Sequence, residues 1–195
     1  MRLFVAIDIE QQIRERMVRF MEGLRGFAPD VRWVDPGSLH LTLKFIGEMP
    51  ESELGKIKGS LRSVHGEPCE IHFRGYGFFP SAKSPRVFWI GIESGPQLSA
   101  LAAETDSALV KLGVPREEHA FTPHLTLARR RGGSGSPRRS RDDGPNAAFQ
   151  IVQKQLTAMA SPDFGTMSAK EFFLYQSQLS PKGSKYTKLE RFALA

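Results

Sequence analysis

Two stretches of the chain recur at one fixed separation, and this repeat limits the possible folds more than any other feature. The tetrapeptide His40–Leu43 (HLTL) recurs as His124–Leu127, 84 positions further along. The apolar run Arg2–Ile7 recurs at the same separation as Arg86–Gly91. Two coincidences at one separation indicate a duplicated unit. We therefore expect two interlocked lobes of similar build, each carrying one HLTL segment.

Each copy of the unit predicts a strand, a helix and a second strand. Residues 2–8 and 86–92 are apolar runs bounded by polar residues, whereas in 11–25 and 97–112 the apolar residues recur every three or four positions. Helices interspersed with a majority of hairpin-like strands favour an α+β fold with antiparallel sheets. Outside the repeat, the patterns predict strands at 69–76, 149–158 and 170–179 and a helix near 51–64.

Length and composition suit a single domain that covers residues 1–195. The chain is 40% hydrophobic and contains 14 Phe, which is ample for a core. No apolar run approaches the roughly 20 residues that a membrane span needs, and the N-terminus lacks the features of a signal peptide. The single cysteine, Cys69, excludes an internal disulfide framework and a cysteine-cluster metal site. We expect a cytoplasmic monomer that does not bind membranes.

Positive charge is concentrated in one segment. The chain carries a net charge of +6, and six arginines but only two aspartates lie between Arg129 and Asp143. Residues 130–147 are rich in Gly, Ser, Pro and Arg without an apolar period, which predicts a flexible basic loop. Such a loop is either a solvated linker or an arm that attracts a polyanion such as RNA.

The alternation of side chains along a strand divides each HLTL segment into two faces. His40 and Thr42 share one face and the two leucines the other, and His124 and Thr126 are placed likewise in the second copy. With the leucines in the core, the two strands would face each other across a groove that presents two imidazoles and two hydroxyls. The remaining histidines have no counterpart at this separation and are interpreted as surface or core residues: His65, His72 and His119.

This set of groups suits the hydrolysis of a phosphodiester. In-line hydrolysis needs a base that takes a proton from water and an acid that protonates the leaving oxygen. Histidine titrates near pH 6.5, so that one ring can be neutral and the other protonated. Threonine hydroxyls can bind the oxygens on which charge develops. The chemistry requires neither a metal ion nor a cofactor, and a strained five-membered cyclic diester is a suitable substrate.

The longer segments 40–48 (HLTLKFIGE) and 124–129 (HLTLAR) resemble the paired HxTx motifs of the two-histidine (2H) phosphoesterase superfamily. Within it, the chain is similar to the RNA 2′,3′-cyclic phosphodiesterases, formerly called 2′-5′ RNA ligases. The opening MRLFVAIDI, segment 75–80 (GYGFFP) and segment 180–186 (SPKGSKY) also fit. The resemblance therefore covers nearly the whole chain.

The resemblance implies a pseudo-twofold pair of α+β lobes, with helices outside and the histidines in a central cleft. It makes His40 the proton donor and His124 the proton acceptor, and it makes Thr42 and Thr126 ligands of the phosphate oxygens. Arg129 is a further phosphate contact by its place after the second motif, although its odd spacing from Thr126 requires a bend in the strand. The expected reaction opens 2′,3′-cyclic phosphate ends of RNA, or small cyclic nucleotides, to 2′-phosphomonoesters.

Two other classes of function compete with this one. A non-catalytic RNA-binding module would use the basic loop for phosphates and exposed aromatic residues for stacking, although Phe45, Phe78 and Phe79 suit a core as well. A metal-dependent phosphatase or nuclease is disfavoured because no cluster of metal ligands adjoins either motif. A 2′-5′ ligase side activity is compatible with the two-histidine site, because catalysis of one direction implies catalysis of the other.

Overall fold

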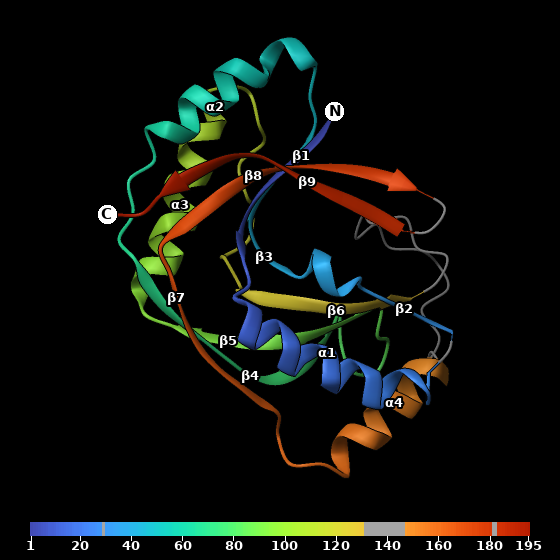
Figure 1. Ribbon diagram of the computed structural model, residues 1–195. Coiled ribbons are helices and arrows are strands. Elements are labelled where there is room, and N and C mark those ends of the chain that lie inside the picture. The colour runs from blue at the N-terminus through green and yellow to red at the C-terminus, as the bar shows by residue number, and fades with distance from the viewer. Residues whose placement is uncertain (29, 131–146, 181–182) are drawn as a thin grey trace.

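Two antiparallel sheets make up the strand framework of the computed structural model, which describes residues 1–28, 30–130, 147–180 and 183–195 (Figure 1). The first, sheet A, has the order β3 (His40–Glu48), β1 (Arg2–Asp8), β8 (Glu171–Ser180) and β9 (Gly183–Ala193). The second, sheet B, has the order β2 (Val31–Trp33), β6 (His124–Arg130), β5 (Val87–Ser94), β4 (Cys69–Phe79) and β7 (Asp163–Ala169).

The helices cross from one sheet to the other. Helix α1 (Gln11–Arg25) follows β1 of sheet A, yet it packs against β2 and β7 of sheet B. Helix α3 (Pro96–Val110) follows β5 of sheet B, yet it packs against β3 of sheet A, next to α2 (Leu54–Arg62). Helix α4 (Ala147–Thr157) lies below α1 in the view of Figure 1. This exchange makes each sheet depend on chain from the other unit.

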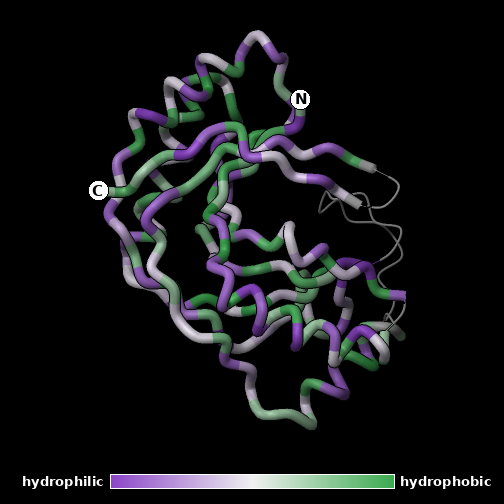
Figure 2. The backbone as a smooth tube through the Cα atoms, in the orientation of Figure 1, coloured by the Kyte–Doolittle hydropathy of each residue, from purple (hydrophilic) through white to green (hydrophobic). Residues whose placement is uncertain are grey.

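One continuous cluster of buried apolar side chains joins the two units. It contains Leu3 of sheet A, Phe88 of sheet B, and residues from α1, α2, α3 and α4. Along the helices, hydrophobic and hydrophilic residues alternate in the way that one buried face requires (Figure 2). Met17 of α1 and Phe88 are fully buried, and burial of each such side chain contributes about 1.5–3 kcal/mol. No helix in the described residues is long and apolar enough to cross a membrane.

A β-bulge interrupts both HLTL strands at the same position. In sheet A, Ala6 pairs with Thr42 and Val5 pairs with Lys44, so that the intervening leucine has no partner. In sheet B the leucine after Thr126 is skipped in the same way. A bulge shifts the alternation of side chains by one residue. The residues beyond the bulges, Lys44 and its counterpart Ala128, are therefore buried next to a buried leucine.

The strand registers correct the repeat by one residue. Asp8 lies opposite His40, and Gly91 lies opposite His124. The equivalent residues of β1 and β5 are therefore 83 positions apart, whereas the two histidines are 84 apart. The expected match of Phe4 with Phe88 is therefore wrong, since the two side chains lie on opposite faces. Phe4 belongs to a small cluster beside His40, whereas Phe88 lies in the main core. A slip of one residue reverses the faces of a strand.

Most predicted elements are confirmed. The strand predicted at 149–158 is wrong, because this segment belongs to helix α4. Its buried residues, Phe149, Val152 and Leu156, follow one another at spacings of three and four, while Ile151 between them is exposed. Strands β7 and β9 were not predicted. The basic segment 130–147 lies outside the described residues except at its two ends.

A buried lysine ties β3 to the second unit. Lys44 is 2% exposed, and its Nζ lies 2.8 Å from Asp106 Oδ1 of α3 and 3.0 Å from Glu117 Oε1. The same ammonium donates a hydrogen bond to the carbonyl of Pro115 at 2.7 Å. Burial by itself raises the pKa of Asp106, but the hydrogen bond from Lys44 outweighs it and leaves that pKa below its ordinary value. The charge of Lys44 is thus satisfied entirely by the other unit.

Candidate active site

The two motif histidines occupy equivalent places in the two sheets. His40 is the first residue of β3, and His124 is the first residue of β6. The leucines of both motifs are buried in the main core, as predicted. Both histidines, Thr42 and Thr126 are half-buried and belong to the other face of their strands. We call this the histidine face of each sheet.

Each imidazole is held by the same hydrogen bond. Nδ1 of His40 lies 2.7 Å from the carbonyl oxygen of Ser38, and Nδ1 of His124 lies 2.8 Å from the carbonyl oxygen of Thr122. A carbonyl can only accept, so Nδ1 carries the hydrogen in both rings. The neutral tautomer that follows leaves Nε2 as the basic nitrogen. Two rings from two sheets therefore present the same atom for proton transfer.

Aromatic side chains surround both rings. The ring of His40 lies 4.8 Å from that of Phe4 and 5.0 Å from that of Tyr186, measured between centroids. The ring of His124 lies 5.0 Å, edge to face, from Phe79 and 6.3 Å from Trp89. These aromatic rings cover part of each imidazole, and both histidines are half-buried.

The surroundings favour the neutral form of both histidines. Burial lowers the pKa of His40 to about 4; the hydrogen bond to Ser38 raises it, and the charge of Arg129 lowers it further. Burial also lowers the pKa of His124, and Arg129 again contributes in the same direction. In the unliganded protein both rings are therefore neutral at pH 7.

Arg129 connects the two histidines. The bulge after Thr126 supplies the bend that its odd spacing required, and it returns Arg129 to the histidine face. Its guanidinium acts electrostatically on both His40 and His124, which places all three groups in one neighbourhood. The sequence suggested Arg129 only by family resemblance, and the strand geometry explains how it reaches the site.

The aromatic residues near the motifs fall into different environments. Phe78 is buried, as a core residue should be, but Phe45 is 56% exposed. The interpretation of Phe45 as a core residue is therefore wrong, because the bulge in β3 turns it outward. Phe79 is half-buried against His124. The other histidines were interpreted as surface or core residues: His65 and His119 are exposed, and half-buried His72 contacts Asp163 at 2.9 Å.

Several neighbours of the histidines could not be found from the motifs. Tyr186 and Tyr175 come from the C-terminal hairpin β8–β9, and Trp89 comes from β5. Gly77 makes room for Trp89, since a Cβ at that glycine would lie 2.1 Å from the indole ring. The only signal for Tyr186 in the sequence was its place in the family-like segment 180–186.

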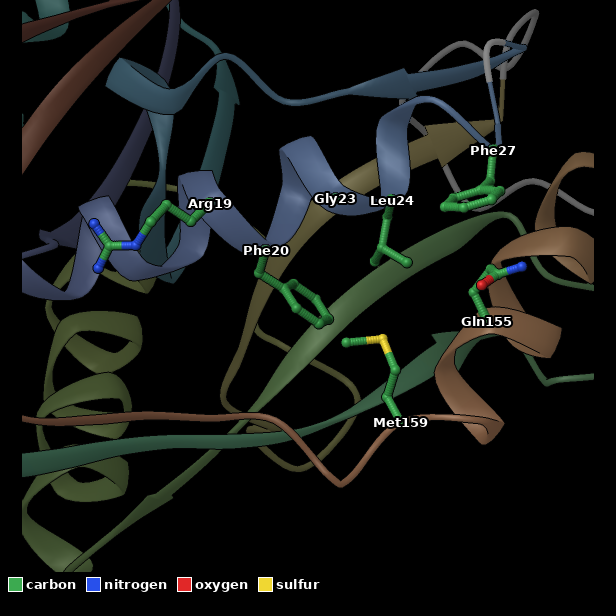
Figure 3. Close-up of a pocket in the computed structure, with 7 residues that line it drawn as sticks. All are labelled: Arg19, Phe20, Gly23, Leu24, Phe27, Gln155 and Met159. Atoms are coloured by element: carbon green, nitrogen blue, oxygen red, sulfur yellow. The ribbon is translucent and has the colours of Figure 1, made fainter.

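Two hollows lie away from the paired imidazoles. One, of about 170 Å³, lies between α1 and α4 on the outer side of sheet B, where Phe20 and Met159 point toward each other (Figure 3). The other, of about 370 Å³, is lined in part by Asp8, the strand partner of His40, and by Phe173. The first is separated from the histidine face by the sheet itself, whereas the second adjoins the end of β1 beside His40.

Paired HxT strands on two related antiparallel sheets define the class of two-histidine phosphoesterases. Comparison with known families agrees: the model of the LigT-like phosphoesterases matches residues 7–89 and again residues 90–186. The chain belongs to this family. Each of the two successive matches contains one HLTL segment.

Known relatives cover the chain from end to end. The chain is 38% identical over 192 residues to a protein of Archaeoglobus fulgidus named RNA 2′,3′-cyclic phosphodiesterase, which covers 98% of this chain and 99% of the relative. A protein of the same name from Methanothermobacter thermautotrophicus is 34% identical over 195 residues, with 99% and 98% covered.

Solved structures of similar proteins have the same fold. The crystal structure of a Thermus thermophilus protein, 30% identical, superposes with a TM-score of 0.78 over 100% of this chain and 98% of the other. The crystal structure of E. coli LigT complexed with 3′-AMP is 27% identical and gives a TM-score of 0.77 over 99% and 97% of the two chains.

Proposed function

We propose that this chain is a phosphodiesterase that opens the 2′,3′-cyclic phosphate at the end of RNA to a 2′-phosphomonoester, without a metal ion or cofactor. The observation that carries the proposal is the matched pair of hydrogen bonds that fix His40 and His124 and leave both Nε2 atoms basic. The family and the activity named for its relatives support the same substrate class.

In the proposed reaction, water attacks the phosphorus in line with the bond to the 3′ oxygen. Nε2 of His124 accepts the proton that the water loses. Nε2 of His40, protonated beforehand, donates its proton to the 3′ oxygen as the P–O3′ bond breaks. The phosphoryl group stays on the 2′ oxygen. The hydroxyls of Thr42 and Thr126 and the guanidinium of Arg129 hold the non-bridging oxygens, on which negative charge develops.

The low pKa of His40 fits the role of acid because the substrate is an anion. In the unliganded protein, burial and the charge of Arg129 disfavour the imidazolium. A bound phosphodiester carries a negative charge that offsets Arg129 and favours the protonated ring. The site therefore takes up the catalytic proton together with its substrate, and the free protein holds two neutral rings.

We expect the ring of His40 to titrate near pH 4 in the free protein and at higher pH with inorganic phosphate bound. The sign follows from burial and Arg129, which both oppose the positive ring, and from the anion, which favours it. NMR titration of the histidine ring protons measures both midpoints. A midpoint near the ordinary value of about 6.5 in the free protein would contradict this account of the site.

The direct test is an oligoribonucleotide that ends in a 2′,3′-cyclic phosphate. We expect a single product that carries its phosphate on the 2′ oxygen, formed at an undiminished rate in excess chelator. Mass spectrometry and phosphorus NMR identify the product and the position of its phosphate. A 3′-phosphate product would reverse the roles of the leaving and retained oxygens, and loss of turnover in chelator would exclude the metal-free mechanism.

Exposed Phe45 supports one alternative, an RNA-binding module without catalysis. This side chain lies next to Phe4, with ring centroids 6.2 Å apart, and offers a face for stacking a base. Binding of the same oligonucleotide without any turnover would favour this alternative. The 2′-5′ ligase reaction is proposed only as a side activity, since the same acid and base serve the reverse direction.

A further inference from the structure

Within the part of the chain that the structure describes, three arginines on the histidine faces of the two sheets lack a carboxylate partner. Among the described residues, no Asp or Glu oxygen lies within 4.0 Å of Arg2, Arg32 or Arg129. Other basic residues of the fold do have a carboxylate partner: Arg14 contacts Asp8 at 2.7 Å, and Lys44 contacts Asp106. Unpaired guanidiniums in one place indicate an anion-binding surface.

Two of these arginines are direct neighbours across strands. Arg32 of β2 pairs with Arg129 of β6, so both side chains leave the same face of sheet B. Like charges directly opposite each other in a sheet are destabilising. Both guanidiniums lie on the histidine face. A bound ligand that carries negative charge would offset their repulsion there.

Arg2 approaches the same place from sheet A. It shares a face of β1 with Phe4, which contacts His40, and it lies opposite Ser177 of β8. Glu48 is its partner in β3, but that carboxylate lies 3.6 Å from the N-terminal amine of Met1 instead. Burial lowers the pKa of Arg129 most, and the charges of Arg2 and Arg32 lower it further, so both of these guanidiniums are close enough to act on that of Arg129.

Arg2 and Arg32 lie some distance along their strands from the histidines and so from the scissile phosphate. Arg2 is six residues from Asp8, the strand partner of His40, which corresponds to about 20 Å along β1. Arg32 lies opposite Arg129, five residues beyond His124 on β6. Arg2 and Arg32 are therefore displaced along the strands from the imidazoles, and Arg129 acts electrostatically both on the two histidines and with these two arginines.

We propose that Arg2 and Arg32, together with Arg129, bind a second phosphate, the one on the 5′ oxygen of the terminal nucleoside. The proposal rests on the proposed function and adds a specificity for substrates that continue on the 5′ side. RNA is bound with its cyclic end at the histidines and with its chain running toward the far ends of β2 and β6. Charge-assisted contacts of this kind fix the register of the strand and carry no base preference.

Three substrates test the second phosphate: a 2′,3′-cyclic mononucleotide with a 5′ hydroxyl, the same mononucleotide with a 5′ phosphate, and a dinucleotide with a cyclic end. We expect wild type to have a higher kcat/KM for the two substrates that carry the second phosphate. Arg2→Gln and Arg32→Gln should each lower kcat/KM for those two about 10-fold and leave the first unchanged. Arg62→Gln on α2, far from β2 in Figure 1, removes the same charge and should change none.

A second measurement guards against loss of folding. Arg32→Gln removes the repulsion with Arg129, so its melting temperature should equal or exceed that of wild type. Equal losses on all three substrates, or a preference for the longer substrates that survives both substitutions, would overturn the second-phosphate site. Failure of wild type to turn over any of the three would instead overturn the proposed function, and this inference with it.

Discussion

Replacement of His40 or His124 by alanine is expected to lower turnover of a cyclic phosphate by about 10²–10⁴-fold, the usual contribution of a positioned acid or base. RNA affinity should change far less, because both threonines and Arg129 remain. The double variant should lose much less than the product of the two single losses, since both groups act in one transition state. Single-turnover rates and binding measured on the same oligonucleotide separate the two effects.

The identity of the leaving group assigns the two roles. A leaving oxygen of low pKa needs little protonation, so such a substrate should restore turnover in His40→Ala and not in His124→Ala. His72→Ala is the matched control, because that histidine contacts Asp163 at the surface and should leave turnover unchanged. Rescue of His124→Ala alone would exchange donor and acceptor, and full activity in both single variants would end the two-histidine mechanism.

Lys44→Met is expected to lower the free energy of unfolding by about 3–5 kcal/mol, because it leaves the buried carboxylate of Asp106 without its cation. For a chain of this size the loss corresponds to a fall in melting temperature of about 10 °C. The pKa of Asp106 lies below its ordinary value of 3.8, so this stabilisation is present above that pH and is lost as the pH falls through the lowered pKa. Chemical denaturation at pH 7 measures the difference.

Two variants bracket this expectation. Lys56→Met breaks an exposed pair with Glu53 and should cost less than about 1 kcal/mol. Lys44→Met combined with Asp106→Leu should recover much of the stability, because an apolar pair of similar volume replaces the ion pair. A change below 1 kcal/mol in Lys44→Met alone would contradict the account.

We propose that residues 1–195 form one domain. If so, every variant should unfold in a single transition.

The sequence predicted the parts of the fold that depend on local periodicity. Helix α1 and the strands of both HLTL segments have clear periods and were correctly placed. Helix α4 was mistaken for a strand because Phe149, Ile151 and Val152 look alike in a short window, and only burial separates them. The order of the strands and the exchange of helices between sheets follow from long-range packing, which no local pattern records.

The histidines and threonines of the site were predictable because a period of two puts them on one face. Arg129 was harder to predict, because its side chain returns to that face only through a β-bulge. The residue types in this strand do not predict that bulge. Arg2, Arg32 and Tyr186 could not be assigned at all. They lie on β1, β2 and β9, and their place on the histidine faces depends on which strands pair rather than on any spacing along the chain.

The hydrogen bonds that orient the two imidazoles have a consequence for how freely this site can vary. Both acceptors are main-chain carbonyls, of Ser38 and Thr122, and neither side chain takes part. Evolution can therefore exchange the residues at 38 and 122 without losing the tautomer, so long as the path of the backbone is kept. The orientation of the two imidazole rings therefore depends on the backbone of the fold and not on the side chains at 38 and 122.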